Sequence, residues 1–265
     1  EALARRSDFI DALINKGSLL VKTDKPVQAI EVLAKAVSLA EDNPLARVNL
    51  ATALKRVGEW DLAWDQCQAA IDLKPDYPEG HGALGDIHAA AGRFGDALAA
   101  YDQALVHRPG FMAVRLNRAA ALHKLNRLDE AAADYTSILE DFDESADAHA
   151  GLGVVHLASG ELDLAVQSFR NAVDLDPKHG TAWAALASAP NAALGDTDLQ
   201  NLKNLTEDST LASDNRIAIH FAIADTDDRT GNFETAFAHY QAGNDARKAV
   251  MTEQDQVFDA AAWMD

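Results

Sequence analysis

Several ordinary ingredients are scarce in this 265-residue sequence. Cys67 is its only cysteine, which excludes an internal disulfide and fits a reducing compartment. Lysine and arginine total 23 against 42 aspartates and glutamates, so the formal charge is −19. A field of that sign repels phosphate backbones and anionic lipids. We therefore expect no nucleic acid and no membrane among the partners, and basic or apolar protein segments fit better.

Recognisable reaction chemistry is missing as well. The sequence has no Gly-x-Ser-x-Gly, no His-Glu-x-x-His and no glycine-rich phosphate loop that ends in Lys-Ser or Lys-Thr. We expect a chain that is not an enzyme and that carries no cofactor and no metal. No apolar stretch approaches the roughly 18–20 residues of a membrane-spanning helix, and no signal peptide is visible. We therefore expect a cytoplasmic protein and, because the sequence starts with Glu1, a fragment of a longer one.

What the sequence does contain is a repeat of 34 residues. Alanine recurs at this interval through five units, at Ala29, Ala63, Ala97, Ala131 and Ala165. Twelve residues before each alanine comes another small residue: Gly17, Ala51, Gly85, Ala119 or Gly153. Four residues after it comes a larger side chain: Leu33, Cys67, Tyr101, Tyr135 or Phe169. A fixed period of this length indicates a stacked array of repeats, which generally binds partners along its length.

Each unit reads as helix, turn and helix. In the unit that starts at residue 78, the first helix is predicted over about residues 78–91 and the second over about residues 95–106. The turn slot holds a residue suited to left-handed backbone, at Gly58, Gly92, Asn126, Gly160 and Gly231. Small residues at the eighth and twentieth positions are predicted to lie where the two helices cross, because leucine there would force them apart.

These residues resemble the tetratricopeptide repeat, whose pattern is Leu-Gly, Gly-x-aromatic, Ala, aromatic, Ala and Pro. The third unit matches this pattern at Leu84, Gly85, Gly92, Phe94, Ala97, Tyr101, Ala104 and Pro109. The resemblance implies an all-α fold, a right-handed αα-superhelix of about seven helix pairs with a C-terminal capping helix. Its concave groove would be lined by the first helices. We expect one solenoid domain over 1–265, with regular repeats at 10–43, 44–77, 78–111, 112–145 and 146–179, an irregular unit at 180–216, a repeat at 217–250 and a cap at 251–265.

The pattern lapses after the fifth unit and returns at Ile217, three residues late. Pro190 is predicted to cut the sixth first helix short, and a substitute second helix is predicted to start at Asp196. Residues 180–250 resemble the last part of the repeat region in bacterial tetratricopeptide–sulfotransferase fusions. That resemblance implies a bacterial parent protein with a further, catalytic domain, whose sulfate-donor loop has no counterpart in this chain.

Histidine pairs raise the question of a metal site. His81 and His88 are seven residues apart, as are His149 and His156. Seven residues place two side chains roughly 10.5 Å apart along a helix, too far to share one ion. We interpret these histidines as helix-interface residues and Cys67 as a small buried hydrophobe.

Groove-facing positions follow from the resemblance. The candidate peptide contacts are Asn49, Thr52, Lys55, Arg56, Asp86, Asn117, Arg118 and His123, with Lys124 on the same face. Asparagine can bond the backbone of an extended peptide as donor and as acceptor. Arg118 stands where other units have leucine, so it either pairs with a carboxylate or marks a ligand contact. A solvated face without a specific ligand is the alternative for the whole set.

One subclass of this family grips a partner's terminal carboxylate with a clamp of Lys, Asn, Asn, Lys and Arg. In the register of the third to fifth units, only Asn117 fits that clamp, and the other places hold Gly82, Asp86, Asp147 and Gly151.

Taken together, the repeat and its resemblances predict a scaffold for a protein or peptide of unknown identity, as the N-terminal interaction region of a larger bacterial protein. Two alternatives stay open, a non-catalytic fragment of a sulfotransferase and a structural array that self-associates through its ends.

Overall fold

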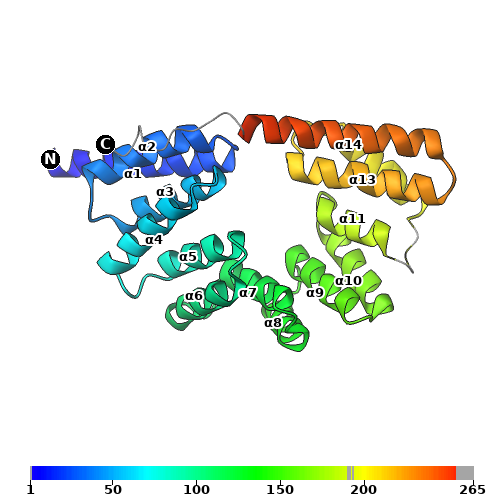
Figure 1. Ribbon diagram of the computed structural model, residues 1–265, viewed down its shortest axis with the longest axis horizontal. Helices are drawn as coiled ribbons and strands as arrows, with labels where there is room; N and C mark the ends of the chain where they lie inside the picture. The colour runs from blue at the N-terminus through cyan, green and yellow to red at the C-terminus, as the bar shows by residue number, and fades with distance from the viewer. Residues whose placement is uncertain (1, 190–191, 193, 255–265) are drawn as a thin grey trace. The chain divides into compact units, whose positions relative to one another are not determined.

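A computed structural model describes residues 2–189, 192 and 194–254, with side chains between residues 9 and 250. The described residues form 14 helices and no strand, which confirms the predicted all-α class (Figure 1). They divide into two compact units, the first ending at Leu125 and the second beginning at Asn126. No helix in this described part is long and apolar enough to cross a membrane.

Unit 1 contains α1 (Ala2–Lys22), α2 (Pro26–Leu39), α3 (Pro44–Arg56), α4 (Trp60–Leu73), α5 (Pro78–Ala90), α6 (Phe94–His107) and α7 (Met112–Lys124). Unit 2 contains α8 (Leu128–Asp141), α9 (Ala146–Ala158), α10 (Leu162–Leu175), α11 (Gly180–Ser188), α12 (Asp196–Thr206), α13 (Ser213–Arg229) and α14 (Phe233–Gln254). Within each unit, helices pack mainly against their neighbours in sequence, except that α11 packs most extensively against α13. Of the predicted cap at 251–265, residues 251–254 continue α14 and residues 255–265 lie outside the described part.

The crossing of the two helices in a repeat depends on the small residue at the eighth position. A Cβ added at Gly153 would lie 2.6 Å from the ring of Phe169, and one added at Gly85 or Gly17 would collide with Tyr101 or Leu33. The large side chain in each case comes from the twenty-fourth position. The eighth position therefore lies at the crossing, as the spacing predicts, and in these three units the twenty-fourth side chain lies against the backbone of the first helix.

Turns between paired helices take the predicted left-handed conformation. The four turn-slot glycines have φ between +73° and +83°, and Asn126 has φ of +58°. Asp24 occupies the same slot in the first unit and also adopts positive φ, at +57°. Aspartate tolerates this conformation better than most residues, so the first unit keeps the turn without glycine.

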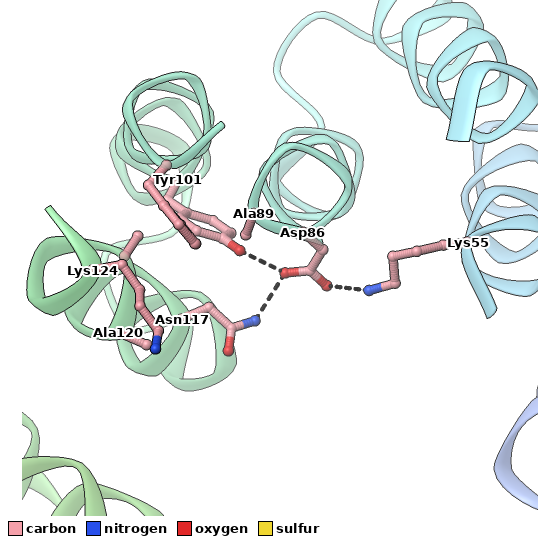
Figure 2. A pocket seen from close by; sticks show the side chains of 9 residues that line it. Lys55, Asp86, Ala89, Tyr101, Asn117, Ala120 and Lys124 are labelled. Carbon is pink, nitrogen blue, oxygen red and sulfur yellow. Dashed lines mark hydrogen bonds and ion pairs between the residues drawn. The ribbon is translucent and has the colours of Figure 1, made fainter. Parts of the chain in front are cut away.

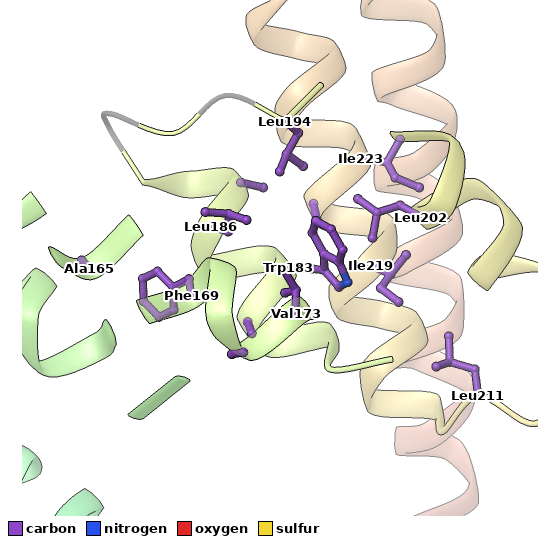
Figure 3. Close-up of a cluster of buried hydrophobic side chains, with 14 residues drawn as sticks. Ala165, Phe169, Val173, Trp183, Leu186, Leu194, Leu202, Leu211, Ile219 and Ile223 are labelled. Atoms are coloured by element: carbon purple, nitrogen blue, oxygen red, sulfur yellow. The ribbon is translucent and has the colours of Figure 1, made fainter. Parts of the chain in front are cut away.

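The irregular unit departs from the expected spacing. Helix α11 ends at Ser188 and Ala189 is extended, as expected for the residue before a proline. The substitute helix α12 begins at Asp196, where the carboxylate of Asp198 accepts a hydrogen bond from the Gly195 N–H at 3.1 Å. Helices α10, α11, α12 and α13 together enclose a core around Trp183, Leu186 and Ile219 (Figure 3).

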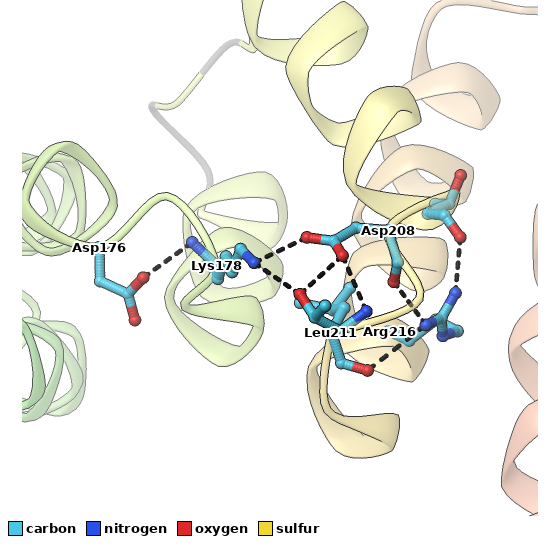
Figure 4. Close-up of polar contacts among 7 residues, drawn as sticks. Asp176, Lys178, Asp208, Leu211 and Arg216 are labelled. Carbon is cyan, nitrogen blue, oxygen red and sulfur yellow. Dashed lines mark hydrogen bonds and ion pairs between the residues drawn. The ribbon is translucent and has the colours of Figure 1, made fainter.

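Helix α13 begins at Ser213, four residues before the predicted start of the returning repeat at residue 217. The Arg216 guanidinium lies in this added turn and donates to the backbone oxygens of Thr206 and Asp208, both at 2.7 Å (Figure 4). Lys178 forms an ion pair with Asp208 at 2.7 Å. Hydrogen bonds from Lys178 and Thr210 hold the pKa of Asp208 well below its usual range. These bonds hold the loop between α12 and α13 in place and stabilise the additional N-terminal turn of α13.

Replacement of Gly153 by alanine tests the crossing. We expect Gly153→Ala to lower the free energy of unfolding by about 1–3 kcal/mol, because Phe169 must move away from the new methyl group. Urea denaturation followed by circular dichroism measures the change. Gly95→Ala is the matched control, since nothing lies within 4 Å of a Cβ at Gly95. Equal stability of the two variants would refute the crossing constraint.

Candidate functional site

A pocket of about 260 Å³ opens between the first helices of unit 1. It is lined by residues of α3, α5, α6 and α7, namely Lys55, Asp86, Ala89, Phe94, Tyr101, Asn117, Ala120, Ala121 and Lys124. Asp86 lies at its centre (Figure 2). The first helices of three successive repeats, α3, α5 and α7, meet here, so the pocket exists only because the repeats stack.

Three donors converge on the Asp86 carboxylate. The Tyr101 hydroxyl donates to Oδ1 at 2.9 Å, and the Asn117 amide nitrogen donates to the same oxygen at 2.8 Å. The Lys55 ammonium pairs with Oδ2 at 3.3 Å. All three contacts are drawn in Figure 2. The charge of Asp86 is therefore compensated inside the protein, and its oxygens hold the side chains of three neighbouring helices.

Packing sets the position of Tyr101. Gly85 leaves room for the ring to lie across α5, and this brings the hydroxyl beside Asp86, the next residue along the helix. Burial, followed by the negative charge of Asp86, raises the pKa of Tyr101 well above its usual value. Tyr101 therefore stays protonated and acts as a hydrogen-bond donor at neutral pH.

Asn117 and Lys124 can contact a ligand. The bond to Asp86 uses the amide nitrogen of Asn117, and its amide oxygen points away from Asp86 (Figure 2). Asn117 and Lys124 are both solvent-exposed. Among the side chains that the structure describes, none pairs with the Lys124 ammonium. The pocket thus presents one oriented amide and one available positive charge.

The structure brings together three of the eight candidate contacts, Lys55, Asp86 and Asn117. The others lie outside the lining of this pocket: Asn49, Thr52, Arg56, Arg118 and His123. The Thr52 hydroxyl donates to the Val48 oxygen of its own helix at 2.9 Å. Arg118 pairs with Asp102 of α6 at 2.7 Å, which is the carboxylate partner that the sequence left as one of two alternatives.

Tyr101 is the polar pocket residue that sequence reasoning missed, because its repeat position predicts an interface residue and no more. A usable pattern does exist. An aspartate at the ninth position and a tyrosine fifteen residues later occur together again at Asp225 and Tyr240 in unit 2. That pair also forms a hydrogen bond, at 2.7 Å.

Histidines and the thiol occupy helix interfaces. The ring of His81 stacks on His107, with centroids 5.9 Å apart, and His156 lies 2.6 Å from Glu161. Within the described residues, no group of three or more His, Cys, Asp or Glu side chains could hold a metal ion. Cys67 is fully buried, and burial raises the pKa of its thiol to about 12, so it packs as a hydrophobe.

Removal of the central carboxylate tests this arrangement. We expect Asp86→Ala to lower the free energy of unfolding by about 1–3 kcal/mol, because the Tyr101 hydroxyl, Asn117 amide and Lys55 ammonium all lose their acceptor. Lys55→Ala removes one partly exposed ion pair and should cost less than about 1 kcal/mol. Urea titrations of both single variants and the double variant give the coupling energy. A Lys55 variant that is less stable than the Asp86 variant would contradict the central role of Asp86.

Solved structures with the same fold share little sequence with this chain. A thermophilic TPR protein from Thermus thermophilus, TTC0263, superposes with a TM-score of 0.62 at 21% identity, covering 68% of this chain and 98% of that one. YrrB, described as a TPR protein with an unusual peptide-binding site, superposes with a TM-score of 0.51 at 20% identity, covering 69% and 95%. At these identities the likeness shows the fold alone.

Curated relatives match over short regions. The Hsp70-Hsp90 organizing protein of Triticum aestivum is 32% identical over 111 residues, which are 42% of this chain and 19% of that protein. The small glutamine-rich tetratricopeptide repeat-containing protein 2 of Mycosarcoma maydis is 28% identical over 98 residues, 37% of this chain and 28% of that protein. This chain therefore spans less than a third of the length of either relative. The tetratricopeptide repeat profile matches residues 14–78, 83–146 and 124–180. Because these matches cover more than half of the chain and agree with its helix pairs, the chain belongs to the tetratricopeptide repeat family.

Proposed function

We propose that this chain is a non-catalytic scaffold that binds a protein or peptide partner, and that the Asp86 pocket of unit 1 is one of its contact points. The observation that carries the proposal is the fixed orientation of Asn117. Its amide nitrogen is bonded to Asp86 at 2.8 Å, while its oxygen faces away from that carboxylate. An asparagine held in this way can accept a backbone N–H of an extended peptide without losing rotamer freedom on binding.

Charge at the pocket decides which side chains fit beside that backbone. Lys55 already pairs with Asp86, so its charge is compensated inside the chain. Lys124 is the lining cation without a described partner. A peptide with an acidic side chain near Lys124 therefore fits the pocket, even though the chain as a whole carries a formal charge of −19.

A terminal carboxylate at the centre of the pocket is disfavoured. Asp86 occupies a place where the family's carboxylate clamp has asparagine, and a second carboxylate beside it would meet like charge. The match to the Hsp70-Hsp90 organizing protein supports a role in protein interaction. It does not support the same type of ligand, because the clamp residues differ.

Titration of the purified chain against an array of extended peptides tests the function. For peptides that bind, we expect Asn117→Ala and Lys124→Ala to weaken binding by about three- to tenfold each, through loss of one backbone hydrogen bond and one ion pair. Fluorescence anisotropy measures the dissociation constants. Arg118→Ala is the control, since Arg118 pairs with Asp102 outside the pocket. Unchanged affinity of every bound peptide for the Asn117 and Lys124 variants would exclude this pocket as a contact.

The identity of the parent protein is a separate proposal. The resemblance of residues 180–250 to bacterial sulfotransferase fusions supports a cytoplasmic bacterial parent in which this array positions a substrate for a catalytic domain. The reading frame of the complete gene tests it. A different domain after residue 265 would exclude the sulfotransferase parent and leave the binding role of this chain untouched.

Self-association is a second candidate role. Phe233 and Phe237, one helical turn apart on α14, are 67% and 69% exposed. Exposed aromatic pairs of this kind favour protein contacts. Light scattering over a range of concentrations tests this role, and a monomer throughout would exclude it.

A further inference from the structure

The last repeat contains a second aspartate–tyrosine pair with the geometry of the first. Asp225 and Asp86 are both ninth in their repeats, and Tyr240 and Tyr101 are both twenty-fourth. The tyrosine hydroxyl donates to the aspartate Oδ1 at 2.7 Å in unit 2 and at 2.9 Å in unit 1. The two carboxylates are therefore held by the same tyrosine contact.

Their second oxygens meet different groups. Oδ2 of Asp86 pairs with the Lys55 ammonium at 3.3 Å. Oδ2 of Asp225 lies 3.3 Å from the Ser188 hydroxyl, which shares its one hydrogen with the Ala184 backbone oxygen at 2.8 Å. Lys55 compensates the first carboxylate, and serine carries no charge that could compensate the second. In the part of the chain that the structure describes, no lysine or arginine side chain pairs with Asp225.

The repeats that precede the two aspartates differ in helix length and in sequence. Lys55 is the twelfth residue of its repeat and lies near the end of α3, a helix of 13 residues. The corresponding helix α11 has only 9 residues and ends at Ser188. The twelfth residue of the unit that starts at residue 180 is Asn191, where the second unit has Lys55. This unit therefore supplies no lysine from that position.

Asp225 lies in a pocket of about 260 Å³, lined by Ala187, Ser188, Asp225, Asp228, Arg229 and Tyr240. Arg229 brings a positive charge into this lining and donates to the backbone oxygen of Ala187. The two carboxylates and one guanidinium leave one net negative charge. Hydrogen bonding to Asp225 raises the pKa of Tyr240 to about 12, so its hydroxyl remains a donor at neutral pH.

We propose that the Asp225 pocket binds the side-chain ammonium group of a lysine from a protein partner, in the place that Lys55 takes beside Asp86. The site lies in unit 2 and uses none of the residues of the Asp86 pocket, so it extends the binding role proposed above to a separate contact. The acidic balance of the chain, 42 acidic against 23 basic residues, adds long-range attraction for a basic segment.

Lysine fits this pocket better than arginine. Tyr240 already donates to Oδ1 of Asp225 at 2.7 Å, whereas Oδ2 has only the longer contact from Ser188. Arginine forms its strongest pairs as a fork that contacts both carboxylate oxygens. Lysine is a compact point charge that needs one oxygen, and it displaces only the 3.3 Å contact from Ser188.

Binding of a lysine peptide to the full chain tests the proposal. The probe is the blocked peptide acetyl-Ala-Ala-Lys-Ala-Ala-amide, and the control peptide carries Nε-acetyl-lysine. We expect the lysine peptide to shift backbone amide resonances of α13 and α14 around Asp225 in ¹⁵N-labelled protein, and the acetylated peptide to leave them in place. Asp225→Asn should weaken binding by about fivefold, since it removes the charge and keeps an acceptor for Tyr240.

Two reciprocal variants guard against a merely structural effect. Ser188→Lys supplies an internal ammonium and should block the peptide while it preserves the fold. Lys55→Met removes the ammonium beside Asp86 and should create a second set of shifts, in α5. Equal binding of the acetylated peptide, or equal binding to the wild type, Asp225→Asn and Ser188→Lys, would overturn the proposal. Asn117→Ala leaves this site intact, so failure of the Asp86 pocket as a contact would be seen separately.

Discussion

The structure depends on one packing contact within each repeat. A small residue in the first helix leaves room for a larger side chain from the second helix. Gly85 and Tyr101 show what this contact does beyond packing. The ring lies close against the backbone of α5 because Gly85 has no side chain, and its hydroxyl then reaches the carboxylate of the very next residue. The same contact therefore sets how the two helices cross and places the Tyr101 hydroxyl in the pocket.

Much of the fold could be predicted because the same local packing requirements recur in every repeat. The turn glycines, the crossing residues and the helix pairs each follow from short-range sterics, and every unit repeats the same requirement. The early start of α13 could not be predicted in this way. It depends on Arg216, whose backbone contacts to Thr206 and Asp208 are set by a loop with no counterpart in the regular units.

The candidate site could be predicted only in part. Repeat position tells which face of a helix a side chain occupies, and this was enough to select Lys55, Asp86 and Asn117. It does not tell which neighbour a long side chain reaches. Arg118 pairs with the Asp102 carboxylate on α6, and the Thr52 hydroxyl donates to the Val48 oxygen of its own helix. Charge pairing between repeats depends on single residues too, since Lys55 lies beside Asp86 and Ser188 lies beside Asp225.

Cys67 has a consequence of a different kind. It takes the place of the usual large side chain in the second repeat, at 0% exposure, and it is the only sulfhydryl in the chain. A thiol reagent can reach it only when the helices packed around it separate. The rate at which this sulfhydryl is labelled therefore measures how often the helices around it open locally, and it reports on unit 1 alone.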